Sequence, residues 1–198
     1  AASKAAYSLD GGLTWTITTI PTADYEATLW DGLRFLAFGG TVVASSPDGI
    51  TWSSLSTLPS AVRNAAANAA IWSPSLALYL VLTGTIVSSP DGVTWTTRSA
   101  IGLNGIAQGG PNVVAVGGAA ARFSADGITW GSATGFAITG VGAAWTGSNY
   151  VVAGNTTNTR ISATGAAWSP GAALPATLSS SQQLVYSSSL GYALIIGN

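Results

Sequence analysis

The sequence contains no cysteine, no histidine and no methionine. Without cysteine and histidine, disulfides, serine–histidine or cysteine–histidine nucleophiles and the usual zinc sites are all excluded. Charged residues make up only 7% of the chain, against about a quarter in an average soluble protein. The 6 basic residues are scattered and the net charge is −1, so we expect no nucleic-acid partner.

Long hydrophobic runs are also missing. The longest, Leu76 to Leu82, has the length of a strand, whereas a membrane-spanning helix needs about 18 apolar residues or more. We therefore expect no membrane insertion and attribute the 47% hydrophobic content to buried sheet. A length of 198 residues predicts one domain.

A short motif recurs along the chain and ends each time in one of the tryptophans. Its spacing is about forty residues, which is typical of a four-stranded repeat such as a propeller blade. The copies are Ser8-Leu-Asp-Gly-Gly-Leu-Thr-Trp15, Ser46-Pro-Asp-Gly-Ile-Thr-Trp52, Ser89-Pro-Asp-Gly-Val-Thr-Trp95, Ser124-Ala-Asp-Gly-Ile-Thr-Trp130 and Ser162-Ala-Thr-Gly-Ala-Ala-Trp168.

The segments around each motif predict a four-stranded antiparallel meander. In the second repeat the expected strands are Ala65–Trp72, Leu76–Leu82, Thr85–Ser89 and Thr94–Ala100, separated by turn residues. The sequence thus predicts an all-β protein, a five-bladed β-propeller. The expected blades are 21–58, 59–101, 102–135, 136–174, and 175–198 together with 1–20.

The last of these blades is divided between the two ends of the chain. Two strands are expected at Gln182–Tyr186 and Leu190–Ile196, and two at Lys4–Ser8 and Thr14–Ile20. Pairing the C-terminal strands, as A and B, with the N-terminal strands, as C and D, would close the ring and remove both exposed sheet edges.

The repeated motif is interpreted as a structural turn. Asp-Gly is a hairpin signal, because glycine accepts a positive φ and the carboxylate accepts hydrogen bonds from turn N–H groups. The motif resembles the Asp-box of sialidases and many other propellers, and that resemblance implies a fold and not an activity. The residues assigned to this role are Asp10, Asp48, Asp91, Asp126, Trp15, Trp52, Trp95, Trp130 and Trp168.

The supply of acidic residues argues against an enzyme. A glycoside hydrolase needs two carboxylates that face each other across the sugar. Of the 7 acidic residues, four lie in the turn motifs, and Asp24, Glu26 and Asp31 fall within one predicted blade. We therefore predict a non-catalytic protein with no catalytic residues, no cofactor and no metal site.

The remaining prediction is a binding or adhesion module, in which a ring of similar blades presents repeated grooves. The candidate ligand-binding residues are Glu26, Asn68, Asn104, Gln182, Trp30, Trp72, Trp145 and Tyr186. The polar members lie four residues before the end of a first strand and could fringe a channel mouth, or could simply satisfy strand ends. The aromatic members could stack on sugars, or could be core residues between blades.

Two functional hypotheses remain open. One is a lectin-like or adhesion module that binds glycans or a surface receptor, similar in plan to small five-bladed lectins. The other is a structural virion component, a phage decoration or tail-fibre domain that contacts other virion or surface proteins or its own copies as a homo-oligomer. The composition is similar to that of phage and secreted bacterial proteins, so an extracellular or virion-associated location is expected.

Overall fold

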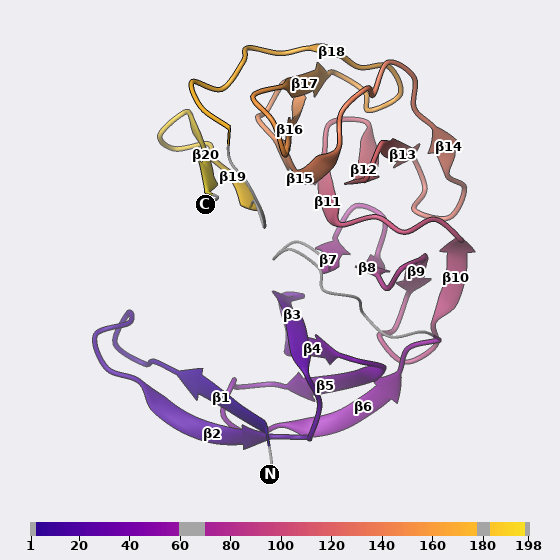
Figure 1. Cartoon of the computed structure of the whole chain (residues 1–198). Coiled ribbons are helices and arrows are strands. Elements are labelled where there is room, and N and C mark those ends of the chain that lie inside the picture. Colours follow the sequence, from indigo (N-terminus) through magenta and orange to yellow (C-terminus); the bar gives the residue numbers. More distant parts are fainter. Residues whose placement is uncertain (1–2, 60–69, 178–182, 197–198) are drawn as a thin grey trace.

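The computed structural model describes residues 3–59, 70–177 and 183–196. Its regular structure in these ranges is entirely β. Four sheets have four antiparallel strands each, and two further sheets have two strands each. The sheets stand side by side along an arc, with β3, β7, β11 and β15 nearest its centre (Figure 1). The predicted β-propeller architecture of four-stranded antiparallel blades is confirmed.

Each complete blade is a meander in chain order, and we name its strands A to D from the inside outward. Blade 1 comprises β3 (Tyr25–Trp30), β4 (Phe35–Gly39), β5 (Val42–Ser46) and β6 (Ser53–Thr57). Blade 2 comprises β7 (Ala70–Ser73), β8 (Leu78–Leu82), β9 (Ile86–Ser89) and β10 (Thr96–Ser99). Blade 3 comprises β11 (Gly105–Gly109), β12 (Asn112–Gly117), β13 (Ala120–Ser124) and β14 (Gly131–Ser132). Blade 4 comprises β15 (Gly140–Trp145), β16 (Tyr150–Gly154), β17 (Thr159–Ser162) and β18 (Ser169–Pro170).

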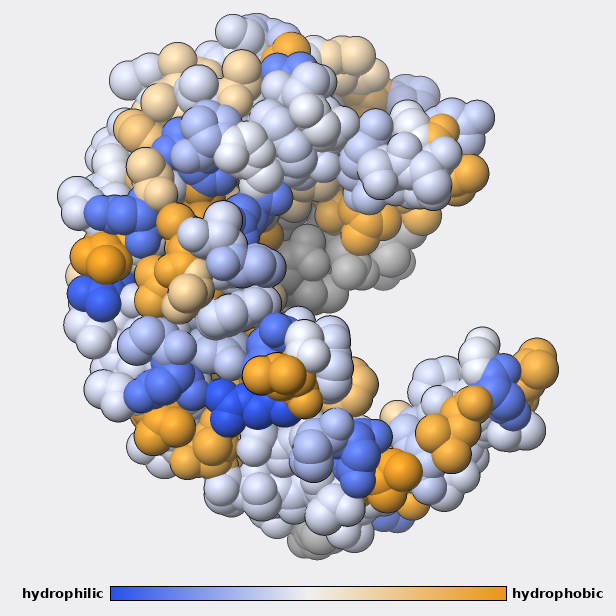
Figure 2. Space-filling model, turned by 180° about the vertical axis from the view of Figure 1, so that it is seen from behind, coloured by the Kyte–Doolittle hydropathy of each residue, from blue (hydrophilic) through white to orange (hydrophobic). Residues whose placement is uncertain are grey.

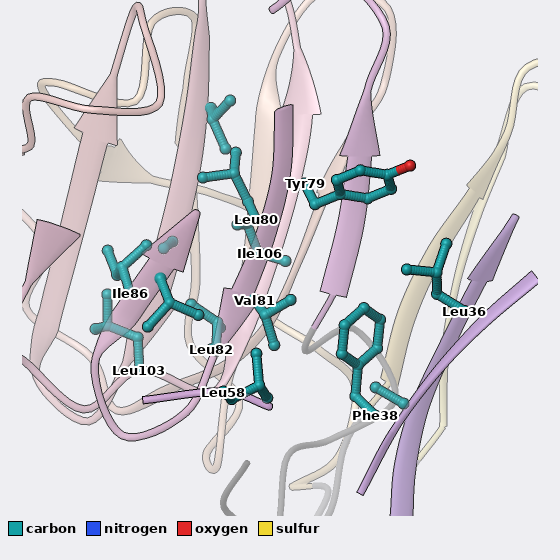
Figure 3. Close-up of a cluster of buried hydrophobic side chains, with 14 of the residues drawn as sticks. Leu36, Phe38, Leu58, Tyr79, Leu80, Val81, Leu82, Ile86, Leu103 and Ile106 are labelled. Atoms are coloured by element: carbon teal, nitrogen blue, oxygen red, sulfur yellow. The ribbon is translucent and has the colours of Figure 1, made fainter. Parts of the chain in front are cut away.

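The hydrophobic pattern of a blade follows from its packing between two neighbours. The B strand is covered on both faces, and Leu78–Leu82 is accordingly apolar and buried at every position. The D strand lies on the outside of the arc, and Thr96–Ser99 is polar and exposed or half-buried. The core therefore lies between the sheets. Figure 3 shows part of it, where Leu36 and Phe38 of blade 1 face Tyr79 and Val81 of blade 2.

One row of residues repeats across the A, B and C strands. The last or next-to-last residue of the A strand lies opposite a B-strand residue, which in turn lies opposite the first serine of the turn motif. The four rows are Trp30–Phe35–Ser46, Trp72–Tyr79–Ser89, Gln108–Val113–Ser124 and Trp145–Tyr150–Ser162. This constant register means that equivalent positions can be compared from blade to blade.

The two terminal hairpins are half-blades. The N-terminal half-blade is β1 (Ser3–Tyr7) with β2 (Thr16–Ile20), and the C-terminal half-blade is β19 (Gln183–Ser187) with β20 (Tyr192–Ile196). They are separate two-stranded sheets, so the predicted closure by pairing the chain ends is not formed. Figures 1 and 2 show the opening from opposite sides.

Each half-blade packs against its neighbouring complete blade, and the two half-blades do not pair with each other. Thr18 of β2 donates its hydroxyl to the carbonyl oxygen of Ile50 in blade 1 at 2.7 Å, and Ile20 is buried against Ala37 and Ala44. At the other end, β19 lies beside β15 of blade 4 (Figure 1). In the described ranges, no helix has the length and apolarity needed to cross a membrane.

Candidate binding site

Glu26 lies on β3, the innermost strand of blade 1, at a β-bulge. Tyr25 is opposite Gly39 and Ala27 is opposite Phe38, so Glu26 is the extra residue between them. A bulge redirects the side chain of the extra residue and often lies beside a functional site. The same irregularity in blade 4 falls on Val141 of β15. The sequence position four residues before the end of the A strand is therefore the bulge position in these two blades.

Glu26 carries an oxygen atom with no partner. Its Oε2 is buried, and within the part of the chain that the structure describes it accepts no hydrogen bond. The residue lines a pocket of about 270 Å³ together with Tyr25, Ala27 and Thr28. A buried carboxylate oxygen without a donor is costly, so a donor from a ligand would be stabilised there. This pocket, which we call the β3 pocket, is the candidate site.

The other predicted polar residues do not join Glu26 in one site. Asn104 precedes β11, is exposed, and donates its backbone N–H to the carbonyl oxygen of Val116 at 2.7 Å. Asn68 and Gln182 lie outside the described residues. The structure thus brings none of the described members of this group next to Glu26.

Three of the four predicted aromatic residues pack at a tilt against an aromatic ring on the neighbouring strand. The ring centroids are 4.5 Å apart for Trp30 and Phe35, and 4.4 Å apart for Trp72 and Tyr79. Trp72 is half-buried, whereas Trp30 is 48% exposed. The aromatic group is therefore divided between packing and exposed surface.

The later blades show the same division. The centroids of Trp145 and Tyr150 lie 4.7 Å apart, and the indole of Trp145 covers Gly109, where a Cβ would overlap it. Trp145 is half-buried, as is Tyr186, which lies opposite Ala193. Of the four predicted aromatic residues, Trp30 is the most exposed.

The motif aspartates organise their own turns. Asp48 Oδ1 accepts hydrogen bonds from the Ser46 hydroxyl at 2.9 Å and from the backbone N–H groups of Ile50 and Thr51 at 2.8 Å each. The indole of Trp52 donates to the carbonyl oxygen of Gly49 at 3.0 Å. Hydrogen bonds of this kind, from Thr129 and Ile128 N–H and the Ser124 hydroxyl, lower the pKa of Asp126 to about 2. In each of these turns one carboxylate oxygen of the aspartate accepts several hydrogen bonds from the turn itself.

The fourth blade keeps the turn without the aspartate. There Thr164 stands in its place, and its hydroxyl accepts the Ala166 N–H at 3.3 Å. The Ser162 hydroxyl donates to the carbonyl oxygen of Ala167 at 2.6 Å, and Trp168 still donates to that of Gly165 at 2.8 Å. The turn geometry is therefore kept with the serine, the glycine, the tryptophan and a threonine in place of the aspartate.

Sequence reasoning missed a polar contact between blades 1 and 2. The Tyr79 hydroxyl donates to Asp31 Oδ2 at 2.5 Å, and Arg34 Nε lies 3.2 Å from the same oxygen. Burial raises the pKa of Asp31, but the hydrogen bonds from Tyr79, Leu33 N–H and Arg34 outweigh it and hold that pKa below its ordinary value. Arg34 also donates to the Asp91 carbonyl oxygen at 2.8 Å. Asp31-Gly32 is a turn dipeptide in the sequence, but nothing local in the sequence indicates Tyr79 as its partner.

A second groove lies between β1 and blade 1, with a volume of about 330 Å³. We call it the edge groove. Its lining includes Ala6, Tyr7, Phe35, Asp48, Gly49 and Trp52. In the described ranges, no three histidine, cysteine, aspartate or glutamate side chains come together as a metal site.

Comparison with known proteins places the fold among propellers. No protein-family model matches the sequence, and no curated protein matches it. Among solved structures, the chain is similar to YCF48 bound to D1 peptide, at a TM-score of 0.62 and 16% identity, over 89% of this chain and 65% of that one. It is similar to a chain of the nidogen/laminin complex at a TM-score of 0.56 and 16% identity, over 79% of this chain and 66% of that one.

A third similar structure is virginiamycin B lyase from Staphylococcus aureus. The TM-score is 0.71 at 11% identity, over 100% of this chain and 78% of that one. At such identities the likeness shows a fold alone. The chain spans about two thirds of the length of the first two proteins. Two of these structures are complexes with a peptide or protein partner, and one is an enzyme, so the group includes both kinds of propeller.

Proposed function

We propose that this protein is a non-catalytic binding module that engages a segment of a protein partner at the β3 pocket. The observation that carries the proposal is Glu26 Oε2, buried on the inner side of the arc without a hydrogen-bond donor among the described residues. A lysine, an arginine or a backbone N–H of an extended segment would supply that donor, and a charged donor contributes about 1.5–3 kcal/mol.

The chemistry of the remaining carboxylates supports binding over catalysis. The motif aspartates are held by turn N–H groups, and Asp31 is held by Arg34 and Tyr79. Glu26 has no second carboxylate facing it across the arc in the described residues, which a glycoside hydrolase would need. One structural relative is a catalytically inactive variant of the lyase in which a histidine is replaced by alanine, and this chain contains no histidine.

The similar structures favour a protein partner over a glycan. One similar structure is YCF48 bound to D1 peptide, and another is a chain of the nidogen/laminin complex. Sugar stacking would need exposed rings that repeat from blade to blade, and of the predicted aromatic residues Trp30 is exposed whereas Trp72, Trp145 and Tyr186 are half-buried.

An array of short extended peptides tests the proposal. Half of the peptides would contain lysine or arginine, and each would be matched by a peptide with glutamine instead. We expect the protein to retain basic peptides, and Glu26→Gln to weaken that binding by about tenfold. Asp24→Asn is the matched control, because Asp24 is an exposed acid two residues away. Equal binding by Glu26→Gln, or binding to a glycan array and not to peptides, would contradict the proposal.

A further inference from the structure

The seams between complete blades share one feature. At each seam, the B-strand residue that comes directly after the one opposite the motif serine packs over the glycine in the turn motif of the next blade. A Cβ at Gly92 would lie 3.3 Å from Leu36, and one at Gly127 would lie 3.6 Å from Leu80. Val114 covers Gly165 in the same way, and all three B-strand side chains are fully buried. This contact is therefore the regular join between consecutive blades.

The edge groove lacks this join. Around Gly49 of blade 1, the nearest described side chain is Phe35 of the same blade, at 3.4 Å from a built Cβ. In the C-terminal half-blade, Tyr186 lies opposite Ala193, so Leu194 is the residue that follows the row. Leu194 is 60% exposed, although Leu36, Leu80 and Val114 at the equivalent position are buried. Among the described residues, no B-strand side chain of a preceding blade covers Gly49 in the edge groove, and Leu194, which is at the equivalent B-strand position, is exposed.

The register of the missing pairing follows from the complete blades. The B-strand residue of the row lies opposite the first serine of the motif in all four. In the N-terminal half-blade that serine is Ser8. Ala193 would thus lie opposite Ser8, Leu194 opposite Tyr7, and Ile195 opposite Ala6. In this register β20 can pair with the free edge of β1.

Within one chain these two strands lie on opposite sides of the opening (Figure 1). Bringing β20 to β1 within one chain would require the blades to tilt against one another. Hydrogen bonds between neighbouring blades oppose such a tilt. Ser56 donates to the Gly92 carbonyl oxygen at 2.8 Å, and Asn112 donates to that of Thr164 at 2.7 Å. Packed interfaces of this kind do not deform continuously. Within one chain the two strands therefore stay apart, and a β20 for the free edge of β1 has to come from a second chain.

We propose that β20 of a second copy adds to β1 in this register and completes a four-stranded blade from two chains. The same contact would cover the second exposed seam. Val151 of blade 4 is equivalent to Leu36, Leu80 and Val114, and Gly12 is the motif glycine of the N-terminal half-blade. Val151 of the second copy would therefore cover Gly12, where the nearest described side chain is Trp15. Trp15 is 65% exposed, although Trp168 in the same motif is 5% exposed. The contact joins two different surfaces, so it is head-to-tail and can repeat.

Mixed single-cysteine variants test this pairing, since the chain contains no cysteine of its own. Ala6→Cys and Ile195→Cys would be purified separately, mixed, and oxidised gently. We expect a disulfide-linked dimer that contains one chain of each variant. The control mixes Ala5→Cys with Ile195→Cys, because neighbouring side chains of a strand point to opposite faces and the off-register pair should not link.

Two further samples decide between the alternatives. A disulfide that forms inside a single Ala6→Cys/Ile195→Cys chain at high dilution, with no mixed dimer, would show ring closure within the chain and overturn the proposal. A cooperatively folded protein that forms neither link would overturn it as well. Leu194→Lys changes an exposed residue, so the variant should fold, and we expect it to raise the concentration for half-association in sedimentation by about tenfold or more.

Discussion

The seam between blades 1 and 2 and the edge groove are built on the same turn motif, but they differ in what lies over it. Gly92 is covered by Leu36 and Arg34 of the preceding blade, whereas Gly49 is covered only by Phe35 of its own blade among the described residues. The exposure of Leu194 and Trp15 is thus not a property of their sequence context. It results from a missing neighbour: Leu36, Leu80 and Val114 are buried at the position equivalent to Leu194, and the motif tryptophans of the complete blades are buried or half-buried.

The largest expected difference between the two regions comes from a pair of leucines. Leu80→Ala removes a fully buried side chain from an interior seam and should lower the free energy of unfolding by about 2–5 kcal/mol. Leu194→Ala removes a mostly exposed side chain and should cost less than about 1 kcal/mol in dilute solution. Urea unfolding of both variants measures the comparison. Equal losses would mean that Leu194 is buried within the single chain.

Two equivalent glycines separate the effect of packing between blades from the effect of backbone strain. Gly92 and Gly49 both have a φ of 75°, so replacement by alanine strains the backbone equally. At Gly92 the new Cβ would also lie 2.9 Å from Arg34 and 3.3 Å from Leu36. We expect Gly92→Ala to be less stable than Gly49→Ala by about 1–2 kcal/mol. Thermal unfolding of the two variants at low protein concentration measures this difference.

The smallest expected effect is the loss of a motif aspartate, which should be the same in a complete blade and in the N-terminal half-blade. The Thr129 and Ile128 N–H groups lower the pKa of Asp126 from 3.8 to about 2, and hydrogen bonds within its own turn also lower the pKa of Asp10 in the N-terminal half-blade. A depressed pKa in the folded state stabilises the protein above pH 3.8, and that contribution is lost as the pH falls through about 2.

Asp126→Asn should therefore lower the unfolding temperature at neutral pH, and the gap to the unaltered protein should close as the pH falls toward 2. Asp10→Asn should behave in the same way, because its hydrogen bonds come from Ser8 and Thr14 of its own turn. Unfolding temperatures across this pH range test both variants. A pH-dependent gap for Asp126→Asn alone would mean that the turn needs its neighbouring blade.

Some features of the candidate site could not be predicted from the sequence, because they depend on pairing and packing between distant residues. The spacing of Glu26 from Trp30 marked a special position, but that a bulge occurs there depends on how β3 pairs with β4. The contact of Asp31 with Tyr79 joins residues of two blades that lie 48 positions apart, and no local pattern encodes it. Trp30 and Trp72 occupy the same place in their strands, and only their surroundings decide that Trp30 is the more exposed.

The sequence by itself determined the repeating unit: strand, turn and register follow from local contacts within about forty residues, and the Ser-Asp-Gly turn closes with its own hydrogen bonds. How the blades stand against one another was decided only in the tertiary structure. The angle between blades arises from side chains such as Leu36 on Gly92 and Arg34 on Asp91, which meet across a seam. These contacts join residues that lie far apart in the sequence, so the repeat alone does not specify them. Closure was therefore a reasonable prediction from the repeat, and an open arc is what the packing produced.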